Sequence, residues 1–521
     1  MKKAFYLFLL LSICNQVSAQ ETFNKRYHFG YPNALLSSIE ITDSSFFAIG
    51  IATDTIGQNQ LGSLFVKFNL EGEVIFSKLL VIPEYTYYTW SNTLLKSEDG
   101  NFMASTLVID SISTGYALIK YTPNGDTLFI KKYEQPFFPQ ENFIIQNDLA
   151  KYNDKYYLIG QIATPDTPFK PDPYLIITDH EGNKTSEQLY GFEDWSHIAM
   201  SLFMTEDGGV IGAYSTNTNF VNGNFVARTY LIGIDTVGVQ QWEYLSPSGE
   251  LFYRAFDVIP ATDGGYVVAT GKGIEVSTAN PNLSTLRWHN YIFKLDADRN
   301  FEWGTFIRDS LYHGSNELRK IIAVSDQSGY VAIGKIYEPN FIEVGSDNHG
   351  IITKVALNGD SLWTRYHHHV VSPSDDHHLY DIEETPDGGF IMVGQATDYE
   401  AQPANPPNQQ GWLLKVDEHG CLVPGCHLIS SLEDDQHAFQ LKLYPNPASD
   451  YLNIYFRNTK STNQAYFKII NQQGILMRQF SSRLSDVTHI LDVHAYAPGV
   501  YFLQYWEGGI LLKTEGFEVL H

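Results

Sequence analysis

The chain has 521 residues and a formal net charge of −25, with 43% hydrophobic and 18% charged residues. This acidic balance excludes the basic surface that binds nucleic acid or an anionic membrane, and the apolar content excludes long disorder. Tyrosine (33) and phenylalanine (32) are abundant, and there are 40 glycines. Such a composition favours strands joined by tight turns.

The first segment, residues 1–19, has the pattern of a secretory signal peptide. Two lysines begin it, an apolar run spans 5–13, and small residues at 17–19 offer a cleavage site before Gln20. The apolar run is about half of the ~20 residues that a membrane span requires. We therefore expect export and no transmembrane segment.

Residues 20–424 contain one phrase seven times: an apolar strand, a turn such as DGG, and an apolar strand that ends in a small residue. Clear copies are TEDGGVIGAY (205–214), ATDGGYVVATG (261–271) and TPDGGFIMVG (385–394). A second phrase follows each copy, and in most repeats it ends in an aromatic strand, as in LIKYTPNGDTLF (118–129). Each repeat thus carries four strand-like pieces with hairpin signals. The recurrence predicts an all-β fold, a seven-bladed β-propeller with four-stranded blades.

The two ends of this repeat region also predict how the ring closes. The seventh repeat lacks its outer aromatic strand, whereas ETFNKRYHFG (21–30) resembles an outer strand and has no repeat of its own. We expect the N-terminal strand to complete the last blade, which also removes an exposed sheet edge.

Two cysteines remain after the signal peptide, Cys421 and Cys426, in the sequence GCLVPGC. An even pair in an exported chain predicts a disulfide. The alternative is a metal site, but only His419 and His427 flank the pair as further ligands.

The repeats end near residue 424, and an acidic linker at 425–440 leads to a different pattern in 441–521. Short alternating strands over about 80 residues fit a small Ig-like β-sandwich. The segment begins with YPNPASDYLNI, continues through an N-x-x-G hairpin and APGVYFL, and ends in a lysine-containing strand. In this order the motifs resemble the type A C-terminal sorting domain of type IX secretion cargo in Bacteroidota. The residues that carry the resemblance are Tyr444, Pro445, Asn446, Pro447, Gly474, Gly499, Tyr501 and Lys513.

The resemblance implies a route. The chain would cross the inner membrane by its signal peptide, and the outer-membrane machinery of type IX secretion would then recognise the C-terminal domain. The protein would be released or held at the outer cell surface. The repeat region is also similar to the cargo propellers of that phylum, a broad and mostly uncharacterised class.

Motifs of common enzymes are missing from the sequence. There is no GxSxG elbow, no HExxH and no P-loop. Nothing in the sequence implies a cofactor. The aspartates of the DG turns are expected to cap those turns through their side chains.

Residues 365–381, RYHHHVVSPSDDHHLYD, hold five histidines and two adjacent aspartates before the final Asp381. Imidazole and carboxylate groups this close together could bind zinc or copper, with His367, His369 and His377 as the candidate ligands. The alternative is a polar connection between blades with solvated histidines.

The connections between repeats are rich in aromatic residues, and in a propeller they gather on one face. Exposed rings there could stack on sugars. The candidates are Trp90, Trp195, Tyr253 and His313. The alternative is that these rings pack between blades.

The sequence therefore favours a non-enzymatic binding or interaction protein at the cell surface, with a glycan or protein ligand. A polysaccharide-acting hydrolase or lyase is the rival. Carboxylates and histidines that converge on the central channel would favour the enzyme.

Overall fold

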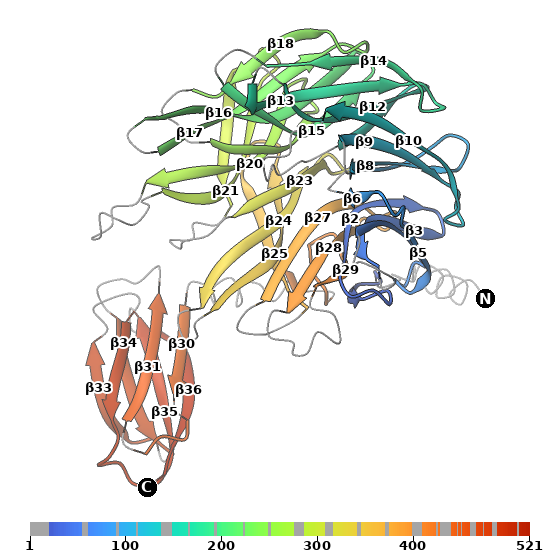
Figure 1. The fold of residues 1–521 in the computed structure, drawn as a ribbon. Coiled ribbons are helices and arrows are strands. Elements are labelled where there is room, and N and C mark those ends of the chain that lie inside the picture. The colour runs from blue at the N-terminus through green and yellow to red at the C-terminus, as the bar shows by residue number, and fades with distance from the viewer. Residues whose placement is uncertain are drawn as a thin grey trace, which may run out of the picture. The chain divides into compact units, whose positions relative to one another are not determined.

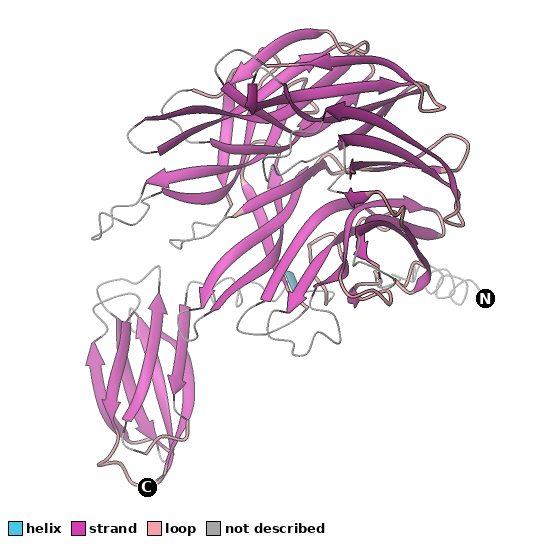
Figure 2. Ribbon diagram, in the orientation of Figure 1, coloured by secondary structure: helices cyan, strands magenta, loops and turns pink. Residues whose placement is uncertain are grey.

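The structure is a computed structural model, and it describes residues 20–520 with internal gaps. The gaps are 55–60, 90–92, 111–112, 137–147, 165–166, 192–194, 222–223, 248–251, 276–285, 308–315, 341–344, 370–374, 399–408, 424–425, 428–438, 445, 450, 459–464, 473, 482–486 and 508–509. The chain divides into two compact units, Met1–Leu422 and Val423–His521. The named elements of both units are strands (Figures 1 and 2).

Unit 1 is built from antiparallel groups of strands that follow one another along the chain. Sheet 1 is β2 (Ala34–Thr42), β3 (Ser45–Thr53), β4 (Leu61–Phe68) and β5 (Val74–Leu80). In sheet 2, β6 (Thr86–Tyr88) and β7 (Leu94–Lys96) both pair with β8 (Phe102–Ile109), followed by β9 (Ser113–Tyr121) and β10 (Thr127–Pro136). Sheet 3 is β11 (Asp148–Tyr152), β12 (Lys155–Thr164), β13 (Thr167–Thr178) and β14 (Lys184–Leu189). Sheet 4 is β15 (Trp195–Thr205), β16 (Gly208–Val221), β17 (Asn224–Ile234) and β18 (Gln240–Leu245).

The remaining strands of unit 1 repeat this order. Sheet 5 is β19 (Phe252–Pro260), β20 (Tyr266–Glu275), β21 (Leu286–Leu295) and β22 (Phe301–Phe306). Sheet 6 is β23 (Glu317–Ala323), β24 (Gly329–Asn340), β25 (Gly345–Ala356) and β26 (Ser361–His367). Sheet 7 is β27 (Asp375–Glu384), β28 (Phe390–Asp398), β29 (Gln409–Val416) and the N-terminal β1 (Phe23–Tyr27). One parallel pair, Asn348 with Asp376, joins sheets 6 and 7 into an eight-stranded sheet.

The first strands of these sheets contact one another in a closed cyclic order. Going round, the order is β2, β7, β11, β15, β19, β23, β27 and again β2. The sheets consequently stand side by side around a common axis, as Figure 1 shows for unit 1. β1 pairs antiparallel with β29 from Phe23–Lys415 to Tyr27–Gly411, which is the pairing that the sequence predicts for the N-terminal strand.

Apolar side chains fill the spaces between neighbouring sheets. Phe47, Phe65 and Tyr121, for example, belong to one buried cluster between sheets 1 and 2. Ile391 and Leu413 of sheet 7 pack with Leu36 of sheet 1 in another. A strand buried on both faces must be apolar at most positions, which explains the continuous apolar runs of the repeats. Each fully buried side chain of this size contributes roughly 1.5–3 kcal/mol.

Unit 2 contains two sheets that share one core. The first is β30 (Phe439–Tyr444), β31 (Tyr451–Asn458) and β34 (Val487–Asp492). The second is β33 (Leu476–Ser481), β32 (Ala465–Asn471), β35 (Gly499–Glu507) and β36 (Ile510–Val519). Leu452 and Ile454 from the first sheet meet Phe467, Leu503 and Tyr505 from the second in a buried cluster.

Candidate functional site

Polar side chains occupy matching positions on the first strands of six sheets in unit 1. In five of these strands a β-bulge directly precedes the residue, at Leu36/Ser38, Ala199/Ser201, Ala255/Asp257, Leu318/Lys320 and Leu379/Asp381. In sheet 3 the residue is Asp148, opposite Ile159. A bulge turns the strand locally and re-aims the side chain that follows it. We call Ser38, Asp148, Ser201, Asp257, Lys320 and Asp381 the axial cluster.

The aspartates of the axial cluster bind the backbone of the next sheet. Asp148 Oδ2 accepts a hydrogen bond from the Leu202 amide at 2.8 Å. Asp257 Oδ2 accepts one from the Ile321 amide at 2.9 Å, and Asp381 Oδ2 accepts one from the Ile39 amide at 3.0 Å. Each carboxylate therefore joins two neighbouring first strands, including the two on either side of the ring closure.

Two serines extend this pattern to other pairs of sheets. Ser201 donates to Asp257 Oδ1 at 2.8 Å, and Ser38 donates to Asp381 Oδ2 at 2.7 Å. The Leu94 amide of sheet 2 in turn donates to the Ser38 hydroxyl at 3.2 Å. The first strands are thus linked across the sheets by buried polar contacts.

Lys320 supplies the positive charge of the axial cluster. Its Nζ lies 3.7 Å from Asp257 Oδ2, and its side chain is 12% exposed. Burial alone would lower the pKa of Lys320, but the carboxylates of Asp257, Asp381 and Asp148 outweigh it and raise that pKa. Burial raises the pKa of Asp148 and of Asp381, while Lys320 acts in the opposite direction on both. The ammonium therefore compensates carboxylates that would otherwise be costly to bury.

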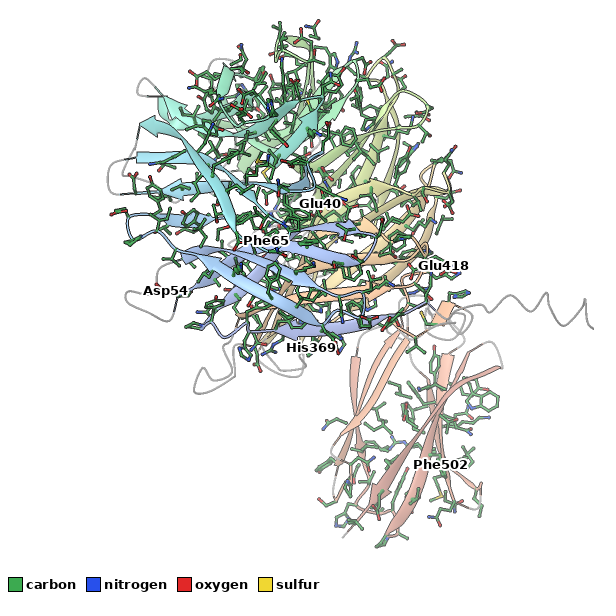
Figure 3. The ribbon with its side chains drawn as sticks, turned by 90° about the vertical axis from the view of Figure 1, so that its right-hand side faces the viewer. Glu40, Asp54, Phe65, His369, Glu418 and Phe502 are labelled. Atoms are coloured by element: carbon green, nitrogen blue, oxygen red, sulfur yellow. The ribbon has the colours of Figure 1, made fainter. Side chains whose placement is uncertain are left out.

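Two glutamates continue the same strands two residues further on. Burial raises the pKa of Glu40, labelled in Figure 3, to about 7, and that of Glu383 to about 8. Asp381 raises both values further, and Glu40 adds to the shift of Glu383. A carboxylic acid that keeps its proton near neutral pH can act as a general acid. This pair is the one part of the axial region with a catalytic character.

The sequence did not single out the axial cluster as a candidate site. The available signal was an acid or serine inside an apolar first strand, at a similar distance before the hairpin turn in several repeats. The carboxylates do converge on the axis, but they do so with hydrogen bonds already made. They hold the strands together instead of pointing to a vacant position.

The structure describes part of the histidine-rich segment, where His367 and His377 bond to backbone groups. His367 is buried and its Nε2 lies 3.0 Å from the Gly420 carbonyl. His377 Nε2 accepts a hydrogen bond from the His369 amide at 3.0 Å, and its Nδ1 lies 3.1 Å from the Asn348 carbonyl. In the described chain, the ring nitrogens of His367, His369 and His377 do not gather within 4.8 Å of one another. Burial lowers the pKa of His377 to about 3, so the ring is neutral and its two nitrogens serve the backbone.

The predicted ligand-binding residues are only partly described. Trp90 and His313 lie outside the described residues, and the side chain of Tyr253 does too. Trp195 begins β15 opposite Asn217 and is partly buried. The structure therefore does not test whether these four residues form one surface.

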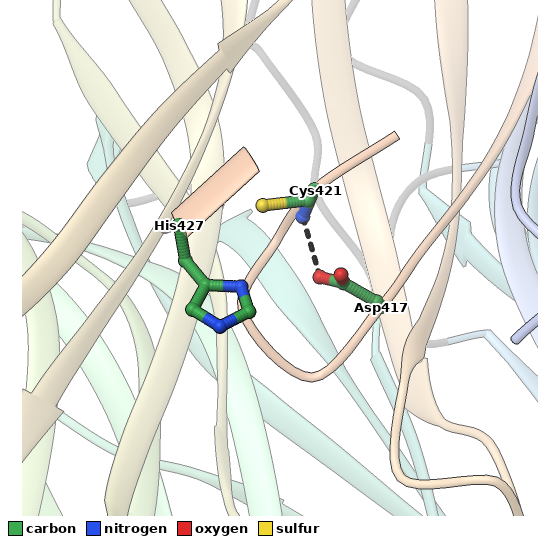
Figure 4. A group of neighbouring side chains, drawn as sticks. All are labelled: Asp417, Cys421 and His427. Carbon is green, nitrogen blue, oxygen red and sulfur yellow. Dashed lines mark hydrogen bonds between the residues drawn. The ribbon is translucent and has the colours of Figure 1, made fainter. Parts of the chain in front are cut away.

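The cysteines lie at the end of unit 1 and just beyond it. Cys421 and Cys426 are both disulfide-bonded. The Asp417 carboxylate accepts a hydrogen bond from the Cys421 amide at 2.7 Å, as Figure 4 shows. Sulfur atoms held in a disulfide are not the thiolates that a metal site requires.

In unit 2 the motif residues hold the ends of strands together. Asn446 Oδ1 accepts from the Glu518 amide at 2.9 Å, and its Nδ2 donates to the Gly516 carbonyl at 3.2 Å. The Asn446–Pro447 peptide is cis. Gly474 has φ 78° at the tip of the β32–β33 hairpin, a conformation that glycine adopts without strain. The Tyr501 hydroxyl donates to the Ala497 carbonyl at 2.8 Å.

The other motif residues sit in the same strands. Tyr444 pairs with Asn453, although its side chain and the whole of Pro445 lie outside the described residues. Gly499 begins β35, and Lys513 pairs with Tyr505 and lies 3.2 Å from Glu515.

The comparison with known families decides what this part of the chain is for. Residues 442–513 match the family described as the secretion system C-terminal sorting domain. The protein is therefore cargo of type IX secretion, secreted or attached to the outer surface. Among the described residues, no helix is long and apolar enough to cross a membrane.

Further comparisons concern the whole chain. No curated protein matches it in sequence. The solved structures that it resembles include Drosophila Semaphorin 2a, at 8% identity and a TM-score of 0.46, covering 96% of this chain and 97% of that one. The polysaccharide lyase Uly1 shares 7% identity at a TM-score of 0.41, covering 73% and 90%. A protein of unknown function from Dyadobacter fermentans shares 10% identity at a TM-score of 0.38, covering 76% and 100%.

Proposed function

We propose that the protein is a binding or interaction module that type IX secretion delivers to the cell exterior. In this proposal residues 1–19 are the signal peptide, 20–424 form a seven-bladed β-propeller, and 425–440 are a linker. Residues 441–521 are the Ig-like β-sandwich that the outer-membrane machinery recognises. The closed order of first strands, together with the pairing of β1 and β29, supports seven blades.

The main support for a protein without catalytic activity is the hydrogen bonding of the axial carboxylates. Asp148, Asp257 and Asp381 all accept backbone hydrogen bonds from the next sheet. A carboxylate that serves as nucleophile or base must be within reach of a substrate. These three act as links between strands, and this leaves the surface connections as the place for binding. Trp90, Trp195, Tyr253 and His313 remain our proposed contacts on the face of the inter-blade connections.

The alternative function is a polysaccharide-acting hydrolase or lyase. The raised pKa values of Glu40 and Glu383 favour it, because perturbed acids gather at active sites. Yet Glu40 and Glu383 owe these values first to burial beside Asp381, a residue with a clear structural role.

Turnover separates the two functions. The mature protein is incubated with a panel of neutral and acidic polysaccharides at pH 5 to 8, and new reducing ends and unsaturated uronic acids are measured. We expect no product above a heat-inactivated control. Product that disappears in Glu383→Gln and Glu40→Gln would establish the enzyme and overturn the binding module.

A further inference from the structure

The outer hairpins of unit 1 share a backbone device. In each sheet, one residue of the turn that follows the third strand adopts a left-handed conformation, with φ between 68° and 87°. Glycine fills this position in six sheets and arginine fills it in sheet 5. The residues are Gly72, Gly125, Gly182, Gly238, Arg299, Gly359 and Gly420.

Five of the six glycines leave room for an aromatic ring of the preceding sheet, whereas Gly238 faces aliphatic side chains. A Cβ built on Gly125 would lie 2.7 Å from the ring of Phe76. A Cβ on Gly359 would lie 2.6 Å from Trp303. These rings are the aromatic residues of the outer strands, so each one is covered by the turn of the next sheet. Only glycine combines this conformation with this close approach.

Arg299 breaks the pattern between sheets 4 and 5. Its φ is 68°. Its guanidinium carbon lies over the Trp242 ring, 5.3 Å from the ring centroid, where the other repeats have a glycine with no side chain. Trp242 lies against Tyr266 of sheet 5, with ring centroids 5.1 Å apart and an angle of 46°. The aromatic ring that a glycine turn covers elsewhere therefore stands here beside a tyrosine and a cation.

A groove lies at this position, on the side of the DGG hairpins. It has a volume of about 270 Å³. Trp242, Tyr266 and the 37% exposed Phe203 supply its aromatic surface, while Asp207 and Gln241 supply polar groups. Its remaining lining residues are Thr205, Gly208, Gly209, Val210, Ile234, Pro260, Gly264 and Gly265.

One hairpin glycine, Gly264, helps to keep this groove unfilled. At Gly264, φ is 90° and the nearest atom to an added Cβ is the Ala297 methyl at 3.8 Å. A longer side chain at this turn would be strained, and it would stand in otherwise open space. The DGG sequence thus leaves accessible backbone at the groove's edge.

We propose that this groove binds one sugar ring of a neutral oligosaccharide. The inference rests on the proposed binding function and adds to it a ligand class and a site on the hairpin side, apart from the contacts proposed on the inter-blade face. A pyranose presents a flat apolar face that stacks on aromatic rings and hydroxyl groups that bond to carboxylate and amide side chains. The volume is near the lower end of ligand pockets, roughly 300–1,000 Å³, and suits a single ring. Asp207 and Arg299 balance one another in charge, which favours a neutral sugar over a polyanion.

A second groove on the hairpin side, between sheets 2 and 3, gives a useful contrast. It is larger, at about 380 Å³. Four of its charged residues form two ion pairs, Lys151 with Glu98 and Lys120 with Asp99, both at 2.7 Å. Its one aromatic residue, Tyr156, bonds through its hydroxyl to Ser97 at 2.8 Å. This groove offers no aromatic platform comparable to Trp242 and Tyr266.

The test is an array of neutral oligosaccharides probed with the chain that begins at Gln20 and keeps its C-terminal domain. Calorimetric titration of the strongest ligand follows. We expect Trp242→Ala to weaken binding by about tenfold or more. Trp303→Phe, at the matching position of the next repeat, should leave affinity within about twofold.

Arg299→Gly is the sharper variant, because it restores the glycine of the other repeats. Trp242 can then pack against the turn as Trp303 does, so binding should fall although the melting temperature does not. A ligand whose affinity survives both Trp242→Ala and Arg299→Gly would overturn the groove but leave the binding module standing. Absence of any neutral ligand on the array would also overturn the groove. Enzymatic turnover would instead overturn the proposed function.

Discussion

Trp412 donates a hydrogen bond from its indole nitrogen to the Asn24 side-chain oxygen at 2.6 Å. Trp412 is fully buried in β29, and Asn24 lies in the N-terminal strand β1. The ends of the repeat region, 388 positions apart in sequence, are therefore tied by a side chain as well as by the β1–β29 backbone pairing.

Removal of residues 21–30 should destabilise the whole of unit 1. The deletion exposes the edge of β29 and leaves the Trp412 N–H buried without its acceptor, which costs about 1–3 kcal/mol before the lost strand contacts are counted. Thermal unfolding of the variant measures this effect. Removal of 428–438, which leaves β30 intact, is the control and should leave the melting temperature unchanged. An unaltered melting temperature after the N-terminal deletion would mean that sheet 7 closes without β1.

The axial aspartates should matter more for stability than aspartates in the hairpin turns. Asp381→Ala leaves the Ile39 amide and the Ser38 hydroxyl without their acceptor in a buried region, and should cost about 2–4 kcal/mol. Asp43→Ala, in an exposed turn, should change stability by about 0.5 kcal/mol or less. Denaturant unfolding of both variants tests this, and equal effects would refute the role of the axial cluster.

The contribution of Glu383 to stability should fall as pH rises from about 4.5 to 8. Glu383 has a pKa of about 8 in the folded protein against 4.5 for the free side chain, so the folded state holds the proton over that interval and the unfolded state does not. Above pH 8 the folded protein must bury the charged Glu383 carboxylate, which costs free energy. Glu383→Gln should abolish this loss and stabilise the protein at pH 9 by roughly 2–4 kcal/mol, while having little effect at pH 4. A variant with the same pH profile as the parent would contradict the assignment.

The disulfide should be present in the exported protein. Mass spectrometry after alkylation without reduction should find no labelled thiol at Cys421 or Cys426. Replacing both cysteines by serine should lower stability by no more than a few kcal/mol, because the closed loop is short. Two alkylated cysteines in native protein would disprove this.

Much of the fold could be predicted from the sequence because it repeats. Each DGG or NG turn between apolar runs marks a hairpin, and the unmatched strand at 21–30 indicated its partner in the last repeat. The axial contacts could not be predicted, since whether Asp381 faces solvent or the Ile39 amide depends on a bulge and on a strand 342 residues away. For the histidines, spacing alone cannot tell a metal ligand from a ring that bonds to the backbone, as His367 and His377 do.

The groove was missed for a different reason. We expected function on the face of the inter-blade connections and took the DGG hairpins as structural. The available signal was DADRN (296–300), where other repeats place glycine in the same turn. Arg299 becomes informative only once the role of the turn glycines is known, and in most repeats that role is to cover an aromatic ring.

The account's central claim is that the C-terminal domain delivers the repeat region to the exterior. Fractionation of cells that produce the chain without residues 441–521 tests it most directly. We expect the truncated protein to be folded, to lack its signal peptide and to remain in the periplasm, while the full chain reaches the surface or the medium. Truncated protein in the medium at the level of the full chain would contradict the claim.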